Sequence, residues 1–131
     1  MIVLFDTNAY TAFARGEAAL LARLDRVERL LMSAVVVGEL EYGFRNGNRY
    51  SANRASLDGF LAEPYVEFLP VTRDTTGRYG QVCAELQRRG RKIPANDAWI
   101  ASHALEHGAE LWTKDAHFAG VGGLAISDWT S

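Results

Sequence analysis

Short apolar segments alternate with longer stretches of helical pattern, and this alternation restricts the folds open to the chain. Ile2–Phe5 is an apolar run that ends at Asp6, which indicates a short buried strand. Four later segments have the same character and are further strand candidates, at residues 30–35, 67–71, 110–113 and 124–126. The order of these segments therefore decides the fold class.

Helical patterns fill the intervals between the strand candidates. Apolar spacing and Gly or Pro breaks predict helices at residues 9–14, 17–30, 36–44, 56–62, 74–89 and 97–107, with a polar loop at 47–53. Thr7 and Asn8 are expected to cap the first helix, and Asn96 the last. This alternation is typical of a three-layer α/β/α fold with a short, mostly parallel central sheet. We expect a single domain over residues 1–131.

Charge and cysteine content narrow the functional classes. The net charge of −2 is unlike that of a strongly basic binder of duplex nucleic acid. The single cysteine, Cys83, excludes an intrachain disulfide, and we expect it to pack in the core. No apolar run approaches the roughly 20 residues of a bilayer span, and Asp6 interrupts the first run too early for a signal peptide. These features predict a cytoplasmic protein without a membrane partner.

Four acidic residues stand where an α/β fold would bring them together. Asp6 directly follows the first strand candidate, and Asp115 lies two residues beyond segment 110–113. Glu39 lies early in the helix after the second strand, and Asp97 opens a later helix. Ligands of open α/β sheets bind beyond the carboxyl ends of the strands, so we expect these carboxylates to converge.

A cluster of carboxylates has a chemical consequence. Carboxylates at close range repel one another and raise one another's pKa. A hard divalent cation removes this penalty, and oxygen donors without Cys or His suit Mg²⁺, with Mn²⁺ as the alternative. Such an ion activates water and holds a phosphate oxygen, so the cluster predicts phosphodiester chemistry. In a simpler interpretation, Asp6 and Asp97 only stabilise helix N-termini, while Glu39 and Asp115 are solvated.

Each of the four acids stands in a short motif. The motifs are LFDTN at residues 4–8, GELEYG at 38–43, IPANDAWIA at 93–101 and LWTKDAHF at 111–118. In this order and at this spacing they resemble the motifs of PIN-domain ribonucleases, specifically the VapC toxins of type II toxin–antitoxin pairs. The ending from Gly123-Leu124 to Asp128-Trp129 is also similar to that family, so the resemblance covers essentially the whole chain.

The resemblance implies roles for particular residues. Asp6, Asp97 and Asp115 would bind Mg²⁺ directly or through water, and Glu39 would complete the pocket through water or a second ion. Residues around them would orient the carboxylates by hydrogen bonds, namely Thr7, Asn8, Asn96 and Thr113. The implied partners are an RNA substrate, a second copy of the chain in a homodimer, and a cognate VapB-type antitoxin in a hetero-oligomer.

Residues 103–107 read HALEH, which matches the H-x-x-E-H pattern of one class of zinc peptidases. His103 and His107 would share one helix face. They also fall in the last turn before Gly108, where histidine pairs with free carbonyls and with the helix dipole. We therefore favour a structural role at the helix end over a zinc site.

Basic residues precede the Asp97 motif. They are Arg88, Arg89, Arg91 and Lys92, and Arg45, Arg49 and Arg54 are candidates to extend the patch from another loop. In one interpretation the patch steers RNA phosphates to the mouth of the site. In the other, it is a solvated helix end favoured by the dipole.

Aromatic and apolar side chains offer further candidate surfaces. Five aromatic residues are candidates for stacking on bases, although core or interface packing is the simpler expectation: Tyr42, Phe44, Tyr65, Phe68 and Tyr79. Apolar residues near the N-terminus are expected to form a groove for the antitoxin: Leu20, Leu21, Leu24, Val27, Leu30 and Leu31.

The leading prediction is an Mg²⁺-dependent endoribonuclease that prefers single strands and inhibits growth as a toxin. Two alternatives stay open. One is a nuclease of the same fold in RNA maturation. The other is a weakly active regulatory module that acts with its antitoxin on operator DNA.

Overall fold

One five-stranded sheet organises the protein, in the order β3-β2-β1-β4-β5. The computed structural model describes residues 1–131. The strands are β1 (Ile2–Phe5), β2 (Arg29–Ser33), β3 (Val66–Leu69), β4 (Glu110–Trp112) and β5 (Ile126–Ser127). Each neighbouring pair is parallel, so the sheet is parallel throughout rather than mostly parallel.

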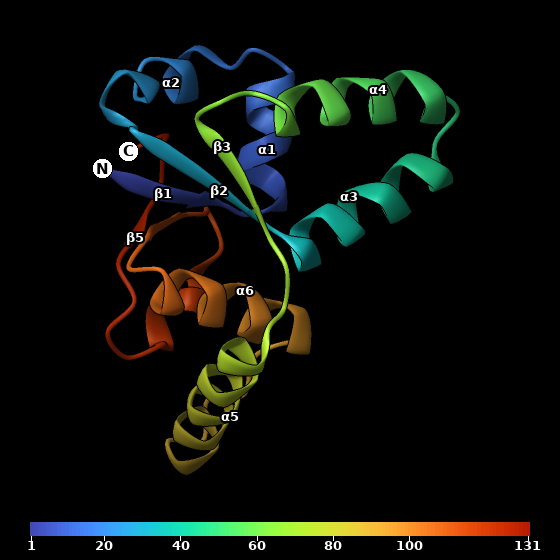
Figure 1. Ribbon diagram of the computed structural model, residues 1–131. Helices are drawn as coiled ribbons and strands as arrows, with labels where there is room; N and C mark the ends of the chain where they lie inside the picture. The colour runs from blue at the N-terminus through green and yellow to red at the C-terminus, as the bar shows by residue number, and fades with distance from the viewer.

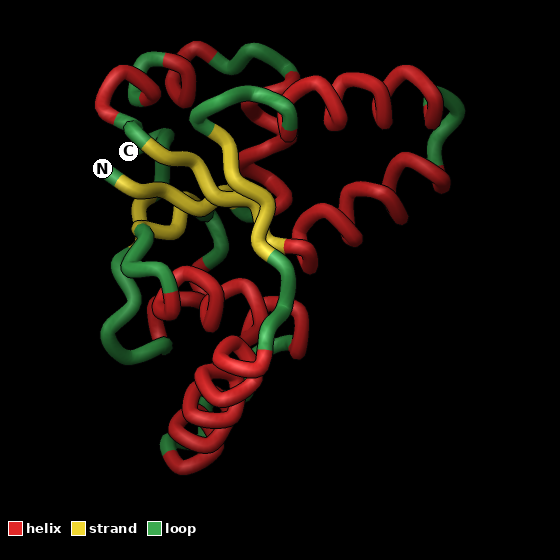
Figure 2. Tube along the Cα trace, viewed as in Figure 1, coloured by secondary structure: helices red, strands yellow, loops and turns green.

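Helices cover both faces of this sheet, which confirms the predicted three-layer α/β/α fold (Figures 1 and 2). The helices are α1 (Thr7–Ala14), α2 (Ala18–Leu21), α3 (Ala34–Asn46), α4 (Tyr50–Leu61), α5 (Arg73–Arg88) and α6 (Ala95–Glu106). Two short 3-10 helices are η1 (Leu24–Arg26) and η2 (Ala116–Gly120). In Figure 1, α1, α2 and α4 lie above the sheet, and α5 and α6 lie below it. None of the helices has the length and apolar character that a membrane crossing requires.

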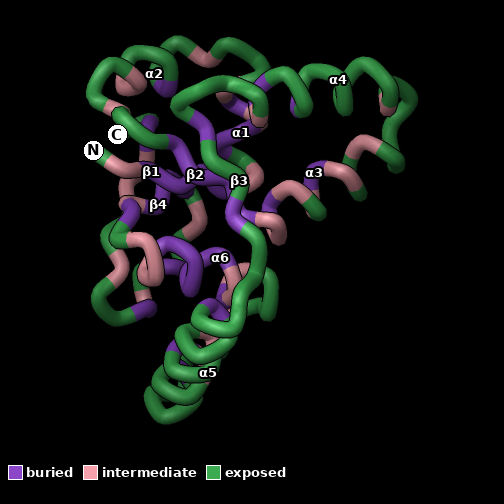
Figure 3. The backbone as a smooth tube through the Cα atoms, viewed as in Figure 1, coloured by how far each residue is buried: buried purple, intermediate pink, exposed green.

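The central strand β1 is buried between the two helical layers (Figure 3). Val3, Leu4 and Phe5 have no solvent exposure, as expected for a parallel strand covered on both faces. β1 pairs on one side with β2 and on the other with β4, in the register Phe5 opposite Trp112. The strand order reverses between β1 and β4, and such a switch point is where open α/β sheets bind ligands.

The segment 17–30 was predicted as one helix, and this prediction is wrong. Only α2 and η1 form there, and β2 begins at Arg29. Leu30 and Leu31 are fully buried in β2, and Leu20 is fully buried under α2. Of the six apolar residues expected to line a partner groove, these three are buried and cannot line one, whereas Leu24 and Val27 are half-buried and Leu21 is exposed.

Helix starts also differ from the predictions. Asp6, rather than Thr7 or Asn8, caps α1, with its Oδ1 atom accepting a hydrogen bond of 2.8 Å from the Ala9 N–H. Pro94 occupies the N-cap of α6, and Asn96 lies inside the first turn. α4 begins at Tyr50, within the segment predicted as a loop. The side chains of Thr7 and Asn96 are therefore free of capping contacts.

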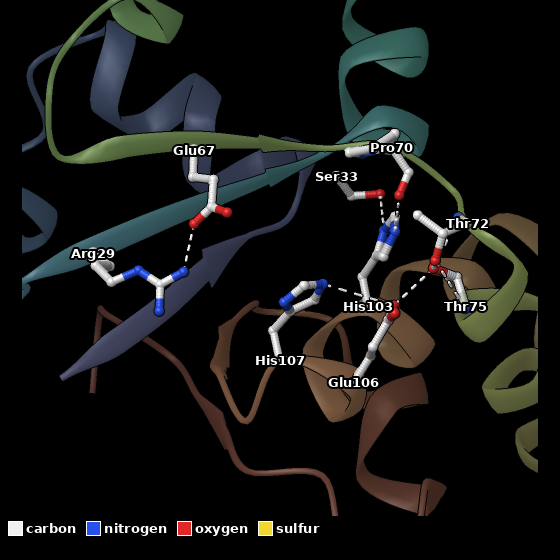
Figure 4. A network of polar contacts seen from close by, with 9 residues as sticks. All are labelled: Arg29, Ser33, Glu67, Pro70, Thr72, Thr75, His103, Glu106 and His107. Carbon is white, nitrogen blue, oxygen red and sulfur yellow. Dashed lines mark hydrogen bonds and ion pairs between the residues drawn. The ribbon is translucent and has the colours of Figure 1, made fainter.

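A buried histidine fixes α6 to the sheet (Figure 4). His103 has no solvent exposure; its Nδ1 lies 2.8 Å from the Ser33 hydroxyl and its Nε2 lies 3.1 Å from the Pro70 carbonyl oxygen. A carbonyl only accepts, so Nε2–H donates to Pro70 and Nδ1 accepts from Ser33. Burial lowers the pKa of His103, which keeps the ring neutral.

This network excludes the zinc interpretation of HALEH. Both ring nitrogens of His103 are used by β2 and by the segment after β3, and the carboxylate of Glu106 accepts a hydrogen bond of 2.7 Å from Thr75. His107 lies 3.7 Å from Glu106 at the helix end. A structural role is confirmed for His103, but its partners are Ser33 and Pro70 rather than the free carbonyls at the end of α6. These contacts hold α6, the helix that carries Asp97.

Candidate metal centre

Asp6 lies at the carboxyl end of β1, in the interior of the molecule. Its side chain is only 5% exposed, and its backbone N–H donates to the Trp112 carbonyl at 3.3 Å. One carboxylate oxygen caps α1, as described above. Because β1 and β4 pair in register, Asp6 stands beside Thr113, the residue that follows β4.

Asp115 reaches the same edge of the sheet from the end of β4. The buried Thr113 hydroxyl accepts a hydrogen bond of 2.9 Å from the Asp115 N–H, which fixes the turn after the strand. Asp115 then caps η2 by accepting a bond of 2.9 Å from the His117 N–H. The turn therefore presents the Asp115 carboxylate at the switch point.

Glu39 projects from α3 and is held by two neighbours. The Thr7 hydroxyl donates to its Oε1 at 2.8 Å, and the Asn96 amide donates to its Oε2 at 3.3 Å. These contacts join α1, α3 and α6 around one carboxylate. Thr7 and Asn96 thus have the orienting positions that were expected of them, whereas Asn8 is exposed and its side chain makes no hydrogen bond.

Asp97 lies in the first turn of α6, and its carboxyl pKa is raised above the usual range. Burial is the main cause, and the charges of Asp115 and Glu39 raise the pKa further, while His117 opposes them. Asp97 is therefore within electrostatic reach of two of the other acids. The structure brings its carboxylate to the common edge by the start of a helix, not by a strand.

The pKa of Asp6 is raised in the same way. Burial is again the main cause, the charges of Asp115 and Asp97 add to it, and contacts with the Thr113 hydroxyl and the Ala9 N–H act against it. Asp6 is buried and Asp97 is half-buried, and each lies close to other acids that raise its pKa further. The four predicted carboxylates are thus gathered at one edge of the sheet.

His117 also belongs to this cluster, although no role was predicted for it from the sequence. Its Nδ1 lies 3.1 Å from Asp115 Oδ1 and 3.6 Å from Asp97 Oδ2. Oxygen atoms of Asp97 and Asp115 and a ring nitrogen of His117 lie within 4.8 Å of one another, a spacing that can hold a metal ion. The position of His117 two residues after Asp115, within the motif LWTKDAHF, was the only signal in the sequence.

The basic segment before α6 is partly occupied by other contacts. Arg89 pairs with Glu85 at 2.8 Å and donates to the Gly120 carbonyl at 2.9 Å, at the end of η2. The other three members, Arg88, Arg91 and Lys92, are exposed and make no ion pair. Arg89 thereby joins the end of α5 to the end of η2, the 3-10 helix that begins directly after Asp115.

Two of the three arginines near the turn between α3 and α4 make contacts within the protein. Arg54 pairs with Glu41 at 3.2 Å and with Asp58 at 3.8 Å, and Arg45 packs over the Tyr50 ring. These contacts join α3 to α4. Arg49 is exposed and makes no such contact, so it alone of the three has a free side chain.

The candidate stacking aromatics fall into two groups. Tyr42 is 71% exposed on α3, three residues after Glu39, and Tyr65 and Phe68 are also exposed. Phe44 packs against the core, and Tyr79 stacks on Trp99 with ring centroids 3.7 Å apart. Cys83 is partly buried against the core, as expected. Stacking of Tyr42 on a base stays a prediction.

Comparison with known proteins agrees with this geometry. The PIN domain family matches residues 3–124. Ribonuclease VapC2 of Rickettsia felis is 30% identical over 98% of both chains, and the tRNA(fMet)-specific endonuclease VapC of Shigella flexneri is 32% identical over 78% of this chain and 76% of its own. The crystal structure of VapBC2 from Rickettsia felis bound to a DNA fragment from its promoter contains a chain with a TM-score of 0.85 at 28% identity, covering 97% of this chain and 98% of that one.

The family match spans most of the sequence, and the relatives align with nearly all of it or with about three quarters. The five-stranded sheet covered by helices on both faces agrees with the predicted three-layer fold. This chain therefore belongs to the PIN domain family, among the VapC ribonucleases.

Proposed function

We propose that this chain, as a single PIN domain over residues 1–131, is an Mg²⁺-dependent endoribonuclease and the toxin of a VapBC-type pair in the cytoplasm. The observation that carries the proposal is the gathering of Asp6, Glu39, Asp97 and Asp115 at the β1–β4 switch point. Its relatives are named as ribonucleases or as a tRNA endonuclease, which favours RNA as the substrate class.

The donor set fits a hard divalent cation. Carboxylate oxygens are the ligands that Mg²⁺ and Mn²⁺ take. Burial and the neighbouring acids raise the pKa of Asp6 and of Asp97, and a bound cation would offset both effects. Asp97 and Asp115 would hold the ion, with Asp6 beside them and Glu39 completing the pocket. When bound, such an ion supplies an acidic water and a contact for a phosphate oxygen.

The remaining residues keep the carboxylates in place. Thr7 and Asn96 hold the two oxygens of Glu39, so that this carboxylate cannot turn away. Thr113 fixes the turn that presents Asp115. Orienting contacts of this kind are expected to matter for metal affinity nearly as much as the ligands do.

The proposed partners are an RNA, a VapB-type antitoxin and a second copy of the chain. The VapBC2 complex, whose toxin chain superposes closely on this one, supports a hetero-oligomer. The exposed side chains of Tyr65, Phe68 and Val71 at the edge strand β3 supply apolar surface for a protein partner. That complex is bound to promoter DNA, so operator binding by the assembled pair is compatible with toxin activity of the free chain.

Growth inhibition tests the proposal. Induced expression of the wild type in bacteria is expected to arrest growth, and sequencing of RNA ends should show new 5′ ends at a small set of sites. Asp6→Asn is expected to abolish both effects, because asparagine keeps the helix cap but removes a carboxylate. Asp25→Asn, in the exposed η1, serves as the matched control and should behave like the wild type.

Other results would favour the alternative functions. Cleavage by the purified protein without growth arrest would favour RNA maturation. DNA binding with a neighbouring antitoxin, together with equal RNA turnover in wild type and Asp6→Asn, would favour the regulatory module.

Neutralising the free cations tests the phosphate-steering role. The double variant Arg88→Ala/Arg91→Ala is expected to cleave single-stranded RNA more slowly at low salt and to depend less on salt. Each lost phosphate contact should reduce the slope of log(kcat/KM) against log[salt] by about 0.7. Steady-state cleavage between low and moderate salt measures this slope.

A charge-matched control accompanies this test. Arg15 and Arg26 are exposed and lie away from the carboxyl ends of the strands, so Arg15→Ala/Arg26→Ala removes the same charge elsewhere. This control should keep the slope of the wild type. Equal slopes in all three proteins would assign Arg88 and Arg91 to a solvated helix end.

A further inference from the structure

His117 differs from the other residues around the acids because its imidazole nitrogen, unlike an amide nitrogen, can bind a metal ion. It lies in η2, two residues after Asp115, and its side chain is 58% exposed. Its Nδ1 points at two carboxylates at once, Asp115 at 3.1 Å and Asp97 at 3.6 Å. Its own backbone N–H donates to Asp115 Oδ1, so the ring is held close to that oxygen.

The spacing of these three donor atoms corresponds to ligands of one ion. Neighbouring ligands in an octahedron with bonds of 2.0–2.1 Å lie about 3 Å apart. The two distances from Nδ1 are at or slightly above this value, and all three donors lie within 4.8 Å of one another. The ring therefore lies where it would contact the same ion as Asp97 and Asp115.

A second explanation gives His117 a different role. A protonated imidazole between two carboxylates is an ordinary ion pair, and it would compete with a bound cation for the same oxygens. A neutral imidazole that binds the ion would instead strengthen binding. The two explanations predict opposite effects of removing His117 on metal affinity, so they can be separated experimentally.

We propose that His117 is a protein ligand of the catalytic ion through Nδ1, which makes this centre prefer Mn²⁺ over Mg²⁺. The proposal rests on the proposed function, because it uses the same metal site. Magnesium favours oxygen ligands only, whereas imidazole is a good ligand for transition metals. A mixed site of two carboxylates and one imidazole thus discriminates between the two ions in a way that four carboxylates do not.

Direct metal binding tests the inference. Isothermal titration of the metal-free full chain with MnCl₂ and with MgCl₂ should give a Mn²⁺ affinity that falls about tenfold or more in His117→Ala. The Mg²⁺ affinity should change by about threefold or less, because oxygen donors dominate its binding. His107→Ala, a half-exposed histidine at the end of α6, is the matched control and should leave both affinities unchanged.

Pulsed electron paramagnetic resonance of the Mn²⁺-loaded chain adds a readout that does not depend on activity. We expect a ¹⁴N coupling from a directly bound imidazole in the wild type and in His107→Ala, and its loss in His117→Ala. Absence of this coupling in the wild type, or tighter Mn²⁺ binding by His117→Ala, would overturn the inference.

One more variant separates the inference from the proposed function. Asp97→Asn should weaken both ions if the acids form the metal site. If Mn²⁺ binding depends on Asp97 but shows no nitrogen coupling, His117 is not a ligand and the proposed metal site of acids still holds. Mn²⁺ binding that is equal in wild type and Asp97→Asn would remove the proposed metal site, and the role of His117 with it.

Discussion

Asp97→Asn should slow RNA cleavage about a thousandfold, which corresponds to about 4 kcal/mol in the activation barrier. Asparagine keeps the size of the side chain and its place in the first turn of α6, but it cannot supply the negative charge that a cation requires. Single-turnover cleavage of a labelled single-stranded RNA at saturating Mg²⁺ or Mn²⁺ measures the effect. A variant that keeps more than a tenth of the wild-type rate would show that Asp97 is not a ligand.

The control for this experiment is Asp74→Asn. Asp74 is an exposed acid in the first turn of α5, so the same chemical change is made at an equivalent helix position outside the site. Its cleavage rate should equal that of the wild type. A fall in both variants would point to a general effect of acids at helix starts.

The substitution Asp97→Asn should also stabilise the metal-free protein against unfolding. The folded-state pKa of Asp97 is raised, so the folded state binds its proton more tightly, and stability decreases as pH rises from 3.8 through the raised pKa. At pH 7 the wild type therefore carries an unfavourable charge that Asp97→Asn lacks. Melting in EDTA should show a Tm increase of about 4 °C, as expected for about 1 kcal/mol in a domain of this size.

His103→Ala should cost about 3 kcal/mol of folding free energy, a large share of the roughly 5–15 kcal/mol that holds a small domain together. The substitution leaves a cavity and removes the partners of the Ser33 hydroxyl and the Pro70 carbonyl. Urea unfolding followed by circular dichroism measures the loss. His107→Ala is the control from the same motif, and it should cost less than about 1 kcal/mol because its only pairing is half-exposed.

The pH dependence of the free energy of unfolding tests independently whether the buried ring of His103 is neutral. The folded-state pKa of His103 lies below 6.5, so the unfolded chain binds the proton more readily. The stabilisation that neutral His103 gives to the folded state is therefore complete above pH 6.5. It declines as pH falls from 6.5 toward the folded-state pKa of His103. The difference between wild type and His103→Gln across pH 5 to 8 isolates it from the carboxyls. A difference that is constant with pH would mean that His103 is not buried as a neutral base.

Sequence patterns predicted the parts of the fold in which local preference and burial agree. The strand β1 is a short apolar run ended by an acid, and α6 begins after a proline and ends before Gly108, whose φ of +62° suits glycine. The helix over residues 17–30 was predicted from the spacing of Leu20, Leu21, Leu24 and Val27, but the chain forms only α2 and η1 there before β2 begins at Arg29. Leu30 and Leu31 belong to the strand predicted at residues 30–35, and they pair with β1 in β2 as that prediction requires.

The candidate site was predictable to the extent that chain order determines it. Three of the four acids follow strand ends, and parallel strands bring these ends to one edge. The contacts of Thr7 and Asn96 with Glu39 depend on how α1 and α6 pack against α3, which no local pattern encodes. His117 was missed for the same reason: its relation to Asp97 arises from the packing of η2 beside α6.

The pairing of β1 with β4 also bears on how a cell survives making such a protein. Val3 lies opposite Glu110, so β1 cannot pair with β4 until about 100 further residues of the chain have been synthesised. Asp6 and Asp115 come together only at that step. A nascent chain that stalls before residue 115 therefore lacks a complete centre, because Asp6 has no Asp115 to join it.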